Sequence, residues 1–366
     1  MKIGMICYPT FGGSGIVATE LGLKLMERGH EVHFISYQLP ERLKTEKDFI
    51  FHEVNVLSYP LFKYKPYTLV LASLLSKLFR EEGIEIMHAH YAIPHSASLY
   101  LAKSIDNRMK IITTLHGTDV HLLGLSDAYK PVLEMCLNNH DALTTVSNFM
   151  KDFITKNYDV RKNIEVIYNF VDPEKFRPAN KEDKDELVLC HVSNFRKVKR
   201  SPDVIRAFAK VYEKHKNIRL EMIGEGPELE YCEDLAICLG LKDKVVFRGS
   251  LLNVPKVLNY TDIFLMPSEI EGFGLAALEA MAHNIPVIAS NAGGLPEVVE
   301  HGKTGFLITP GDVNAMAKYI TMLIEDDALR KKLGAEAGRV AREKFHPDKI
   351  VSLYEALYER VLHERN

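Results

Sequence analysis

The sequence predicts an α/β protein built from two doubly wound, Rossmann-like domains. Short runs rich in Val, Ile and Leu alternate with amphipathic stretches, and this alternation stops near the middle of the chain and then begins again. The 366 residues are too many for one ordinary core and suit two domains of roughly 150 to 200 residues each. With 46% hydrophobic and 26% charged residues, each half can bury a core of its own.

The first half contains runs typical of buried parallel strands. They lie at 2–7, 31–37, 84–90, 110–115 and 142–146. The longer amphipathic stretches between them predict crossover helices, and therefore repeated βαβ units. We expect a first domain at 1–170.

The segment V-I-Y-N-F-V-D-P-E-K-F-R-P at 166–178 ends a strand and then carries Asn, Asp and two prolines, a composition suited to a hinge near 169–178. Further strand-like runs follow at 187–192, 219–223, 245–248, 263–266, 286–289 and 305–308. These runs predict a second Rossmann-like domain at 171–346.

The last segment, 347–366, has the spacing of an amphipathic helix. Its apolar face is predicted to consist of Ile350, Leu353, Tyr354, Leu357 and Val361. Because such a face needs a surface to cover, we expect this helix to pack back toward the first domain.

Composition excludes several classes of function. A net charge of -3, with both signs mixed along the chain, creates no broad field for nucleic acid or anionic lipid. The sequence has neither a signal-peptide pattern nor an apolar stretch long enough to span a bilayer, which predicts a cytoplasmic protein without membrane insertion. The five widely spread cysteines are expected to be reduced.

Ligands of doubly wound folds lie at the carboxyl ends of the strands, here in a cleft between the two domains. After the first strand, Gly13, Ser14 and Gly15 precede a helical pattern, so their backbone N–H groups could meet a phosphate or sugar oxygen. A plain turn explains these glycines equally well, because their spacing is not that of a dinucleotide fingerprint.

The basic run S-N-F-R-K-V-K-R at 193–200 follows a strand of the second half and precedes a helix opened by Ser201 and Pro202. Asn194, Arg196 and Lys199 are therefore candidates for holding a diphosphate without a metal ion. A charge run is more often a solvated face, but its position after a strand favours the ligand. In the turn I-G-E-G-P at 223–227, two glycines could bring the backbone around Glu225 close to the same ligand, but a mere turn explains this segment equally well.

The segment E-G-F-G-L-A-A-L-E places Glu271 in a loop and Glu279, eight positions later, on a helix. Carboxylates accept hydrogen bonds from vicinal hydroxyls, so one can hold the transferred sugar and the other a ribose. The backbone N–H groups of Phe273, Gly274 and Leu275 could meet phosphate at the start of that helix. Two glutamates at this spacing are also common by chance.

In the first half, His116 opens the segment H-G-T-D after a strand, where an imidazole can serve either the cleft or the core. Ser14, Tyr91 and Thr114 also lie at loop or strand ends near the expected cleft. The further segment H-A-H-Y-A-I-P-H at 88–95 offers neither a fixed tetrahedral set nor a thiol or carboxylate partner, so we expect no metal site.

Taken together and in this order, these segments resemble the retaining family-4 glycosyltransferases of GT-B fold, over essentially the whole chain. The resemblance implies that the domain at 1–170 binds the acceptor, for which Ser14, Tyr91 and Thr114 are candidates, and that the domain at 171–346 binds the nucleotide-sugar donor. It implies that Glu271 binds sugar hydroxyls, Glu279 the ribose and Lys199 the diphosphate. It also implies that His116 lies near the transferred sugar and that no metal or other cofactor is needed. Asn194 stands where the family commonly has an arginine, and Arg196 is our candidate for the missing charge.

Four segments, at 7–15, 88–95, 113–119 and 193–200, further resemble one subfamily. That resemblance implies UDP-N-acetylglucosamine as the donor, L-malate as the acceptor and a place at the first step of bacillithiol synthesis. The cation that would bind the malate carboxylates stays open among residues such as Lys63, Lys65 and Lys130. A homodimer is also left open.

Three alternatives accompany this interpretation. A family-4 glycosyltransferase could use another acceptor, such as an inositol phosphate or a glycan. A UDP-N-acetylglucosamine 2-epimerase shares the two-lobed architecture and the sugar nucleotide but needs no acceptor. A two-lobed binding protein without chemistry is disfavoured by the clustered charged residues at the expected cleft and by the missing signal peptide.

Overall fold

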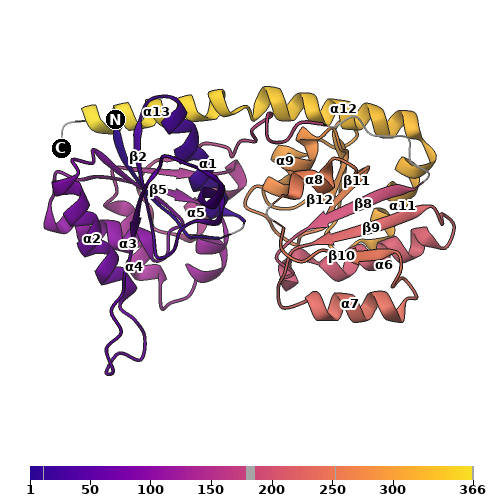
Figure 1. The fold of residues 1–366 in the computed structure, drawn as a ribbon, viewed down its shortest axis with the longest axis horizontal. Coiled ribbons are helices and arrows are strands. Elements are labelled where there is room, and N and C mark those ends of the chain that lie inside the picture. Colours follow the sequence, from indigo (N-terminus) through magenta and orange to yellow (C-terminus); the bar gives the residue numbers. More distant parts are fainter. Residues whose placement is uncertain (11, 179–185, 252, 365–366) are drawn as a thin grey trace. The chain divides into compact units, whose positions relative to one another are not determined.

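The structure is a computed structural model that describes residues 1–10, 12–178, 186–251 and 253–364. It divides the chain into two compact units (Figure 1). Unit 1 comprises Met1–Asn169 and Pro347–Asn366, and unit 2 comprises Phe170–His346. The sequence-based boundaries were set after residues 170 and 346.

Unit 1 is built on a seven-stranded sheet whose order is β3-β2-β1-β4-β5-β6-β7 in the described part of the chain. All of its strand pairs are parallel. The strands are β1 Lys2–Ile6, β2 Glu31–Ser36, β3 Ile50–Glu53, β4 Ile86–His90, β5 Lys110–Leu115, β6 Ala142–Thr145 and β7 Ile164–Val166. The connecting helices are α1 Ser14–Glu27, η1 Glu41–Thr45, α2 Tyr67–Glu81, α3 His95–Ile105, η2 Asp119–Leu123, α4 Lys130–Asn138 and α5 Asn148–Asn157.

Period-2 alternation assigns the strand side chains of unit 1 to two buried faces. Met87 and Ala89 of β4 belong to an apolar cluster with α2 and α3. His88, between them, points to the other face, where its Nδ1 lies 2.7 Å from the hydroxyl of Tyr358. Both faces are therefore covered, which explains why these strands are continuous apolar runs in the sequence.

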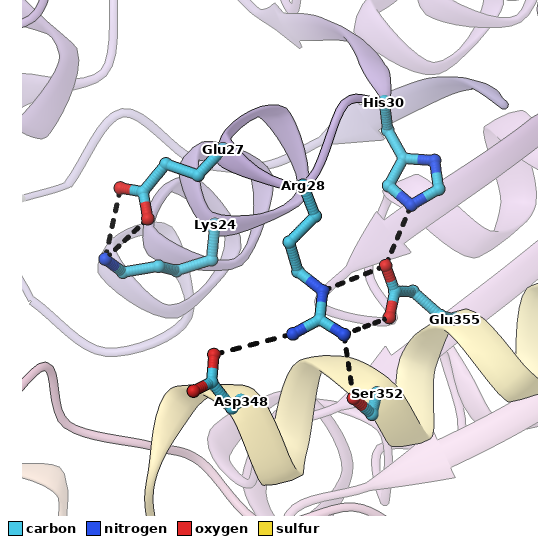
Figure 2. A network of polar contacts seen from close by, with 7 residues as sticks. All are labelled: Lys24, Glu27, Arg28, His30, Asp348, Ser352 and Glu355. Carbon is cyan, nitrogen blue, oxygen red and sulfur yellow. Dashed lines mark hydrogen bonds and ion pairs between the residues drawn. The ribbon is translucent and has the colours of Figure 1, made fainter.

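The C-terminal helix α13, Pro347–His363, belongs to unit 1 and lies beside α1 (Figure 1). Figure 2 shows the polar contacts at this junction: the Arg28 guanidinium donates to Glu355 Oε2 at 2.8 Å and to the Ser352 hydroxyl at 2.9 Å. His30 Nε2 lies 2.9 Å from Glu355 Oε1. A helix far away in sequence is thus bonded to the end of α1.

The buried face of α13 differs from the predicted one at Leu353. This side chain is 49% exposed, and Val351 and Tyr358 are buried instead, together with Ile350, Tyr354, Leu357 and Val361. Including Leu353 in the apolar face was therefore wrong. The helix is rotated so that the Tyr358 hydroxyl contacts His88 in the core. In this rotation Leu353 faces the solvent.

Unit 2 contains a second parallel sheet, with the order β10-β9-β8-β11-β12-β13 among the described residues. Its strands are β8 Leu187–Val192, β9 Ile218–Ile223, β10 Val245–Phe247, β11 Ile263–Met266, β12 Val287–Ser290 and β13 Gly305–Ile308. Its helices are η3 Lys197–Lys199, α6 Ser201–Tyr212, α7 Leu229–Cys238, α8 Val254–Leu258, α9 Leu275–Ala282, α10 Leu295–Val298, α11 Val313–Glu325 and α12 Asp327–Lys344. One apolar core joins α6, α7 and α11 to this sheet.

The two doubly wound sheets confirm the predicted fold class. In each sheet the strand order reverses once, between β1 and β4 in unit 1 and between β8 and β11 in unit 2. Loops that leave neighbouring strands in opposite directions separate at such a point and form a crevice at the carboxyl ends. Within the described ranges, no helix is long and apolar enough to cross a membrane.

Candidate active site

The basic run of unit 2 leaves the carboxyl end of β8 at the reversal of strand order. After the short helix η3, Arg200 adopts a left-handed conformation with φ 53° and leads directly into α6. Pro202 in the first turn of α6 suits a helix start because its missing N–H would have no helical partner. The run therefore makes a tight turn at the carboxyl end of β8.

Lys199 and Glu271 form an ion pair in this crevice. Lys199 Nζ lies 2.5 Å from Glu271 Oε1, and the two side chains are 16% and 12% exposed. The Ser268 hydroxyl donates to the same oxygen at 2.7 Å, and the backbone N–H of Glu269 donates to the carbonyl of Val198 at 2.7 Å. The loops after β8 and β11 are thus joined through both backbone and side chains.

Around this pair, the turn I-G-E-G-P packs directly on the basic run. Gly224 and Gly226 have φ of 119° and 156°, and a Cβ on either would come within 2 Å of the carbonyl oxygen of Ser193 or Asn194. Glu225 between them is exposed, and its Oε1 accepts from the N–H of Ser250 at 3.3 Å. Only glycine permits this approach.

Two predicted diphosphate ligands differ in their surroundings. The side chain of Asn194 is exposed. Arg196 is half-buried, and its Nε is a buried donor without a hydrogen-bond partner among the described residues. A buried guanidinium N–H without an acceptor is costly, so Arg196 fits a site that an anionic ligand completes.

The helix predicted after Gly274 is α9. Gly274 has φ 102° and precedes its first residue, Leu275. Glu279 is the fifth residue of α9 and is half-buried, whereas Phe273 is 3% exposed and packs its ring edge-on against Phe345. Glu271 and Glu279 are therefore held on different supports, a loop and a helix.

In unit 1, His116 follows β5 and contacts His90 at the end of β4, with His116 Nε2 3.0 Å from His90 Nδ1. Burial lowers the pKa of His116 to about 3 and that of His90 well below its usual value, so both rings are neutral at pH 7. Asp119, fully buried, accepts from the N–H groups of Ala92 at 2.8 Å and Gly117 at 2.7 Å. This carboxylate joins the loops after β4 and β5.

The three predicted acceptor-binding residues have different positions in unit 1. Ser14 is the first residue of α1, next to Gly13 with φ 63°, and Gly15 packs within the first turn against the carbonyl of Tyr8. Tyr91, with φ 92°, lies edge-on to the Tyr8 ring at 5.3 Å between centroids. Both residues lie at the carboxyl edge of the sheet.

Thr114 does not fit its predicted role. It is fully buried, and its hydroxyl lies 2.7 Å from His88 Nε2 and 2.6 Å from the hydroxyl of Thr144. These contacts belong to the buried polar network beneath α13. Alternation along β5 points this side chain into the sheet packing, so the structure does not present it to a ligand.

The histidines of the segment 88–95 serve the core instead of forming a metal cluster. His88 and His95 are both fully buried, and His95 Nδ1 donates to the carbonyl of His90 at 3.1 Å. Across the described ranges, no group of three or more His, Cys, Asp or Glu side chains is placed to hold a metal ion. Cys7, close to the glycine loop, is buried, which raises the pKa of its thiol to about 12.

Sequence reasoning missed three residues of these crevices: Asp119, His191 and Ser268. Asp119 is the last residue of H-G-T-D, so its motif was noticed but its backbone contacts were not. His191 and Ser268 stand at or just after strand ends, the position that marked the other candidates. Only the pairing of β8 with β11 shows that these two side chains lie near Lys199 and Glu271.

Two family descriptions cover nearly the whole chain. Residues 11–175 match "Glycosyltransferase Family 4", and residues 172–340 match "Glycosyl transferases group 1". A relative from Bacillus anthracis, named N-acetyl-alpha-D-glucosaminyl L-malate synthase, is 42% identical over 374 residues that span 100% of this chain and 98% of the relative. The chain belongs to glycosyltransferase family 4.

Other similar proteins agree with this family-4 glycosyltransferase in fold and enzyme class. A GDP-mannose-dependent phosphatidylinositol monomannoside mannosyltransferase from Mycobacterium tuberculosis is 28% identical, covering 72% of this chain and 73% of its own. The crystal structure of Anabaena HepE in complex with UDP and glucose superposes with a TM-score of 0.82 at 20% identity, over 98% of this chain and 100% of the other. The family-4 enzyme thus has the GT-B fold and is a glycosyltransferase, as the sequence predicted.

Proposed function

We propose that this chain transfers N-acetylglucosamine from UDP-N-acetylglucosamine to the hydroxyl of L-malate, with retention of configuration, as the first step of bacillithiol synthesis. The observation that carries the proposal is the Lys199–Glu271 pair at the strand reversal of unit 2. The choice of these two substrates is supported by the relative from Bacillus anthracis, which is similar over its whole length.

The donor half of the proposal assigns the sugar nucleotide to unit 2. Lys199 exchanges Glu271 for the diphosphate when the donor binds, and Glu271 then accepts hydrogen bonds from the sugar hydroxyls. Arg196 supplies the second cation, which its unpartnered buried Nε supports. Glu279 receives the ribose hydroxyls, and the start of α9 at Gly274 directs backbone N–H groups toward phosphate.

The proposed transfer step needs no protein nucleophile. The malate hydroxyl oxygen bonds to the anomeric carbon while the bond from that carbon to the diphosphate oxygen breaks. The hydroxyl proton passes to the departing diphosphate on the same face, and UDP leaves. Negative charge grows on UDP in this step, so Lys199 and Arg196 stabilise the transition state more than the bound donor.

The acceptor half assigns malate to unit 1, with Ser14 and Tyr91 at the edge of its sheet and His116 near the transferred sugar. His116 is neutral, so it serves there as a hydrogen-bonding group, not as a cation. We further propose that the reaction requires no metal ion, takes place in the cytoplasm and does not depend on membrane or nucleic acid. Unchanged turnover in excess EDTA would support the first of these points.

The deciding experiment measures UDP release from UDP-N-acetylglucosamine with L-malate, with an inositol phosphate and with a glycan acceptor. We expect release with malate, and an α-linked product by the anomeric coupling constant in proton NMR. Release with another acceptor but not with malate would overturn the substrate assignment. Conversion of the sugar nucleotide without any acceptor would indicate an epimerase instead. Sedimentation of the purified chain tests the open question of a homodimer.

A further inference from the structure

His191 lies in unit 2, near enough to Lys199 and Glu271 for both charges to act on its ring. It is the fifth residue of β8, and 1% of its surface is exposed. Its Nδ1 lies 2.8 Å from the carbonyl oxygen of Leu265, and its Nε2 lies 3.0 Å from the hydroxyls of both Ser193 and Ser201. One imidazole therefore contacts three separate segments of the chain.

The partners of the ring determine its tautomer. A carbonyl oxygen only accepts, so Nδ1 carries the proton and donates to Leu265. Nε2 is then an acceptor, and one serine hydroxyl donates to it. The two hydroxyls are 3.0 Å apart, so the second serine can donate to the first. Both ring nitrogens and both serine hydroxyls have suitable hydrogen-bond partners only while the ring is neutral.

The contacted segments adjoin the loops that carry Lys199 and Glu271. Leu265 stands in β11 just before the loop that holds Ser268 and Glu271. Ser193 begins the basic run, and its hydroxyl also accepts from the backbone N–H of Phe195 at 3.2 Å. Ser201 ends the run as the first residue of α6. His191 therefore fixes both ends of the loop on which Lys199 stands.

The charge state of the ring matches this arrangement. Burial lowers the pKa of His191 to about 4; the hydrogen bond to Leu265 opposes that shift, Lys199 adds to it and Glu271 opposes it. The imidazole is therefore neutral at pH 7. A protonated ring would lose its acceptor for the hydroxyls of Ser193 and Ser201.

We infer that His191 is a positioning residue that sets the place of Lys199 relative to Glu271 through its hydrogen bonds to Ser193 and Ser201. The inference rests on the proposed role of Lys199 and Glu271 in donor binding. His191 itself touches neither the sugar nor the diphosphate in this scheme. It acts by holding the loop so that the Lys199 ammonium meets the departing phosphate without reorganisation.

Two substitutions separate the contacts of the ring. In His191→Asn the amide nitrogen replaces Nδ1 and keeps the bond to Leu265, but the acceptor for the serines is lost. In His191→Gln the longer side chain brings its carbonyl oxygen to the position of Nε2, so the serines keep their acceptor while Leu265 loses its donor. Each variant loses one side of the imidazole, and we expect similar decreases in Tm.

Kinetics distinguish positioning from mere stability. We expect His191→Asn to lower kcat/KM for the donor by about 10- to 100-fold with an unchanged KM for the acceptor, because a small misplacement of a catalytic group has effects of this order. His191→Gln should stay within about fivefold of the wild type, since the serine contacts are kept. Wild-type kinetics in folded His191→Asn, or equal losses in both folded variants, would overturn the inference.

Two further variants keep the test decisive. Ser193→Ala leaves the ring and Leu265 in place, so it carries the test if His191→Gln does not fold; a loss like that of His191→Asn supports the inference and wild-type kinetics overturns it. His140→Asn is the matched control, because His140 is equally buried and donates to the carbonyl of Cys136 in unit 1, and its kcat should be unchanged. Binding of UDP to the wild type by calorimetry tests the donor assignment separately: its absence would refute the proposed function, whereas UDP binding together with wild-type kinetics in folded His191→Asn would overturn the role of His191 alone.

Discussion

At the scale of single residues, the two opposite charges of Lys199 and Glu271 neutralise each other in unit 2. Lys199 and Glu271 are both mostly buried, and each would be costly there without the other. In the proposed donor complex, the diphosphate and the sugar hydroxyls would replace each of these two groups as the partner of the other, so the ion pair would stabilise the protein before the donor binds. Arg196 adds a buried donor that has no such internal partner among the described residues.

Lys199→Ala is expected to lower kcat by about 100- to 1,000-fold, the loss typical of removing one preorganised group that stabilises charge in the transition state. Steady-state kinetics of UDP release measures the effect. Lys197→Ala is the matched control, because Lys197 is exposed in the same run and its removal changes net charge by the same amount. Near-normal turnover of Lys199→Ala would refute its role on the diphosphate.

At the scale of elements, α13 stabilises unit 1 through a buried polar network as well as an apolar face. The Tyr358 hydroxyl meets His88, and His88 in turn meets Thr114 on β5. Polar groups this deep in the core must be paired, so the network specifies how the helix is rotated on the sheet. That rotation explains why Leu353 lies at the solvent side while Tyr358 is buried.

Tyr358→Phe should lower the free energy of unfolding by about 1 to 3 kcal/mol, because it leaves His88 Nδ1 buried without a partner. Urea unfolding followed by circular dichroism measures the change, and the enzyme should keep its kcat. Leu353→Ala on the same helix is the control and should change stability by less than about 0.5 kcal/mol. A larger effect of Leu353→Ala than of Tyr358→Phe would contradict the helix orientation.

At the scale of the whole molecule, buried neutral histidines occur in both units. Burial lowers the pKa of His88 to about 3 and the pKa of His95, His140 and His191 to about 4 each. In the unfolded chain these rings titrate near pH 6.5. Between that value and the folded pKa, the unfolded state binds more protons, so stability is present at neutral pH and is lost as the pH falls.

We therefore expect the free energy of unfolding to decrease on acidification below about pH 6.5, by up to about 1.4 kcal/mol per pH unit for each such histidine. Urea unfolding at a series of pH values from 7.5 to 5 measures the slope. In His140→Asn, the slope should decrease by about one proton, because that variant lacks one of these buried neutral rings. A pH-independent stability across this range would contradict the buried neutral state.

The sequence by itself determined the fold class, the family and most strand positions, because continuous Val/Ile/Leu runs at βαβ spacing have few structural solutions. The short edge strand β3 was missed, since its half-exposed residues Ile50–Glu53 carry no buried pattern. The sequence also singled out Lys199 and Glu271, although their separation of 72 positions gave no sign of their contact.

Only the tertiary structure decided which side chains share a crevice and which face the core. Thr114 and Tyr91 both stand at strand ends, but strand alternation and the network beneath α13 bury the Thr114 hydroxyl, whereas Tyr91 lies at the edge of the sheet. In the sequence, His191 looks like an ordinary strand residue. Its contact with Leu265 exists only because β8 and β11 are neighbours in the sheet, and Ser193 and Ser201 complete the surroundings of the ring. Local patterns specify elements, but such contacts depend on long-range strand pairing, which no short window of sequence contains.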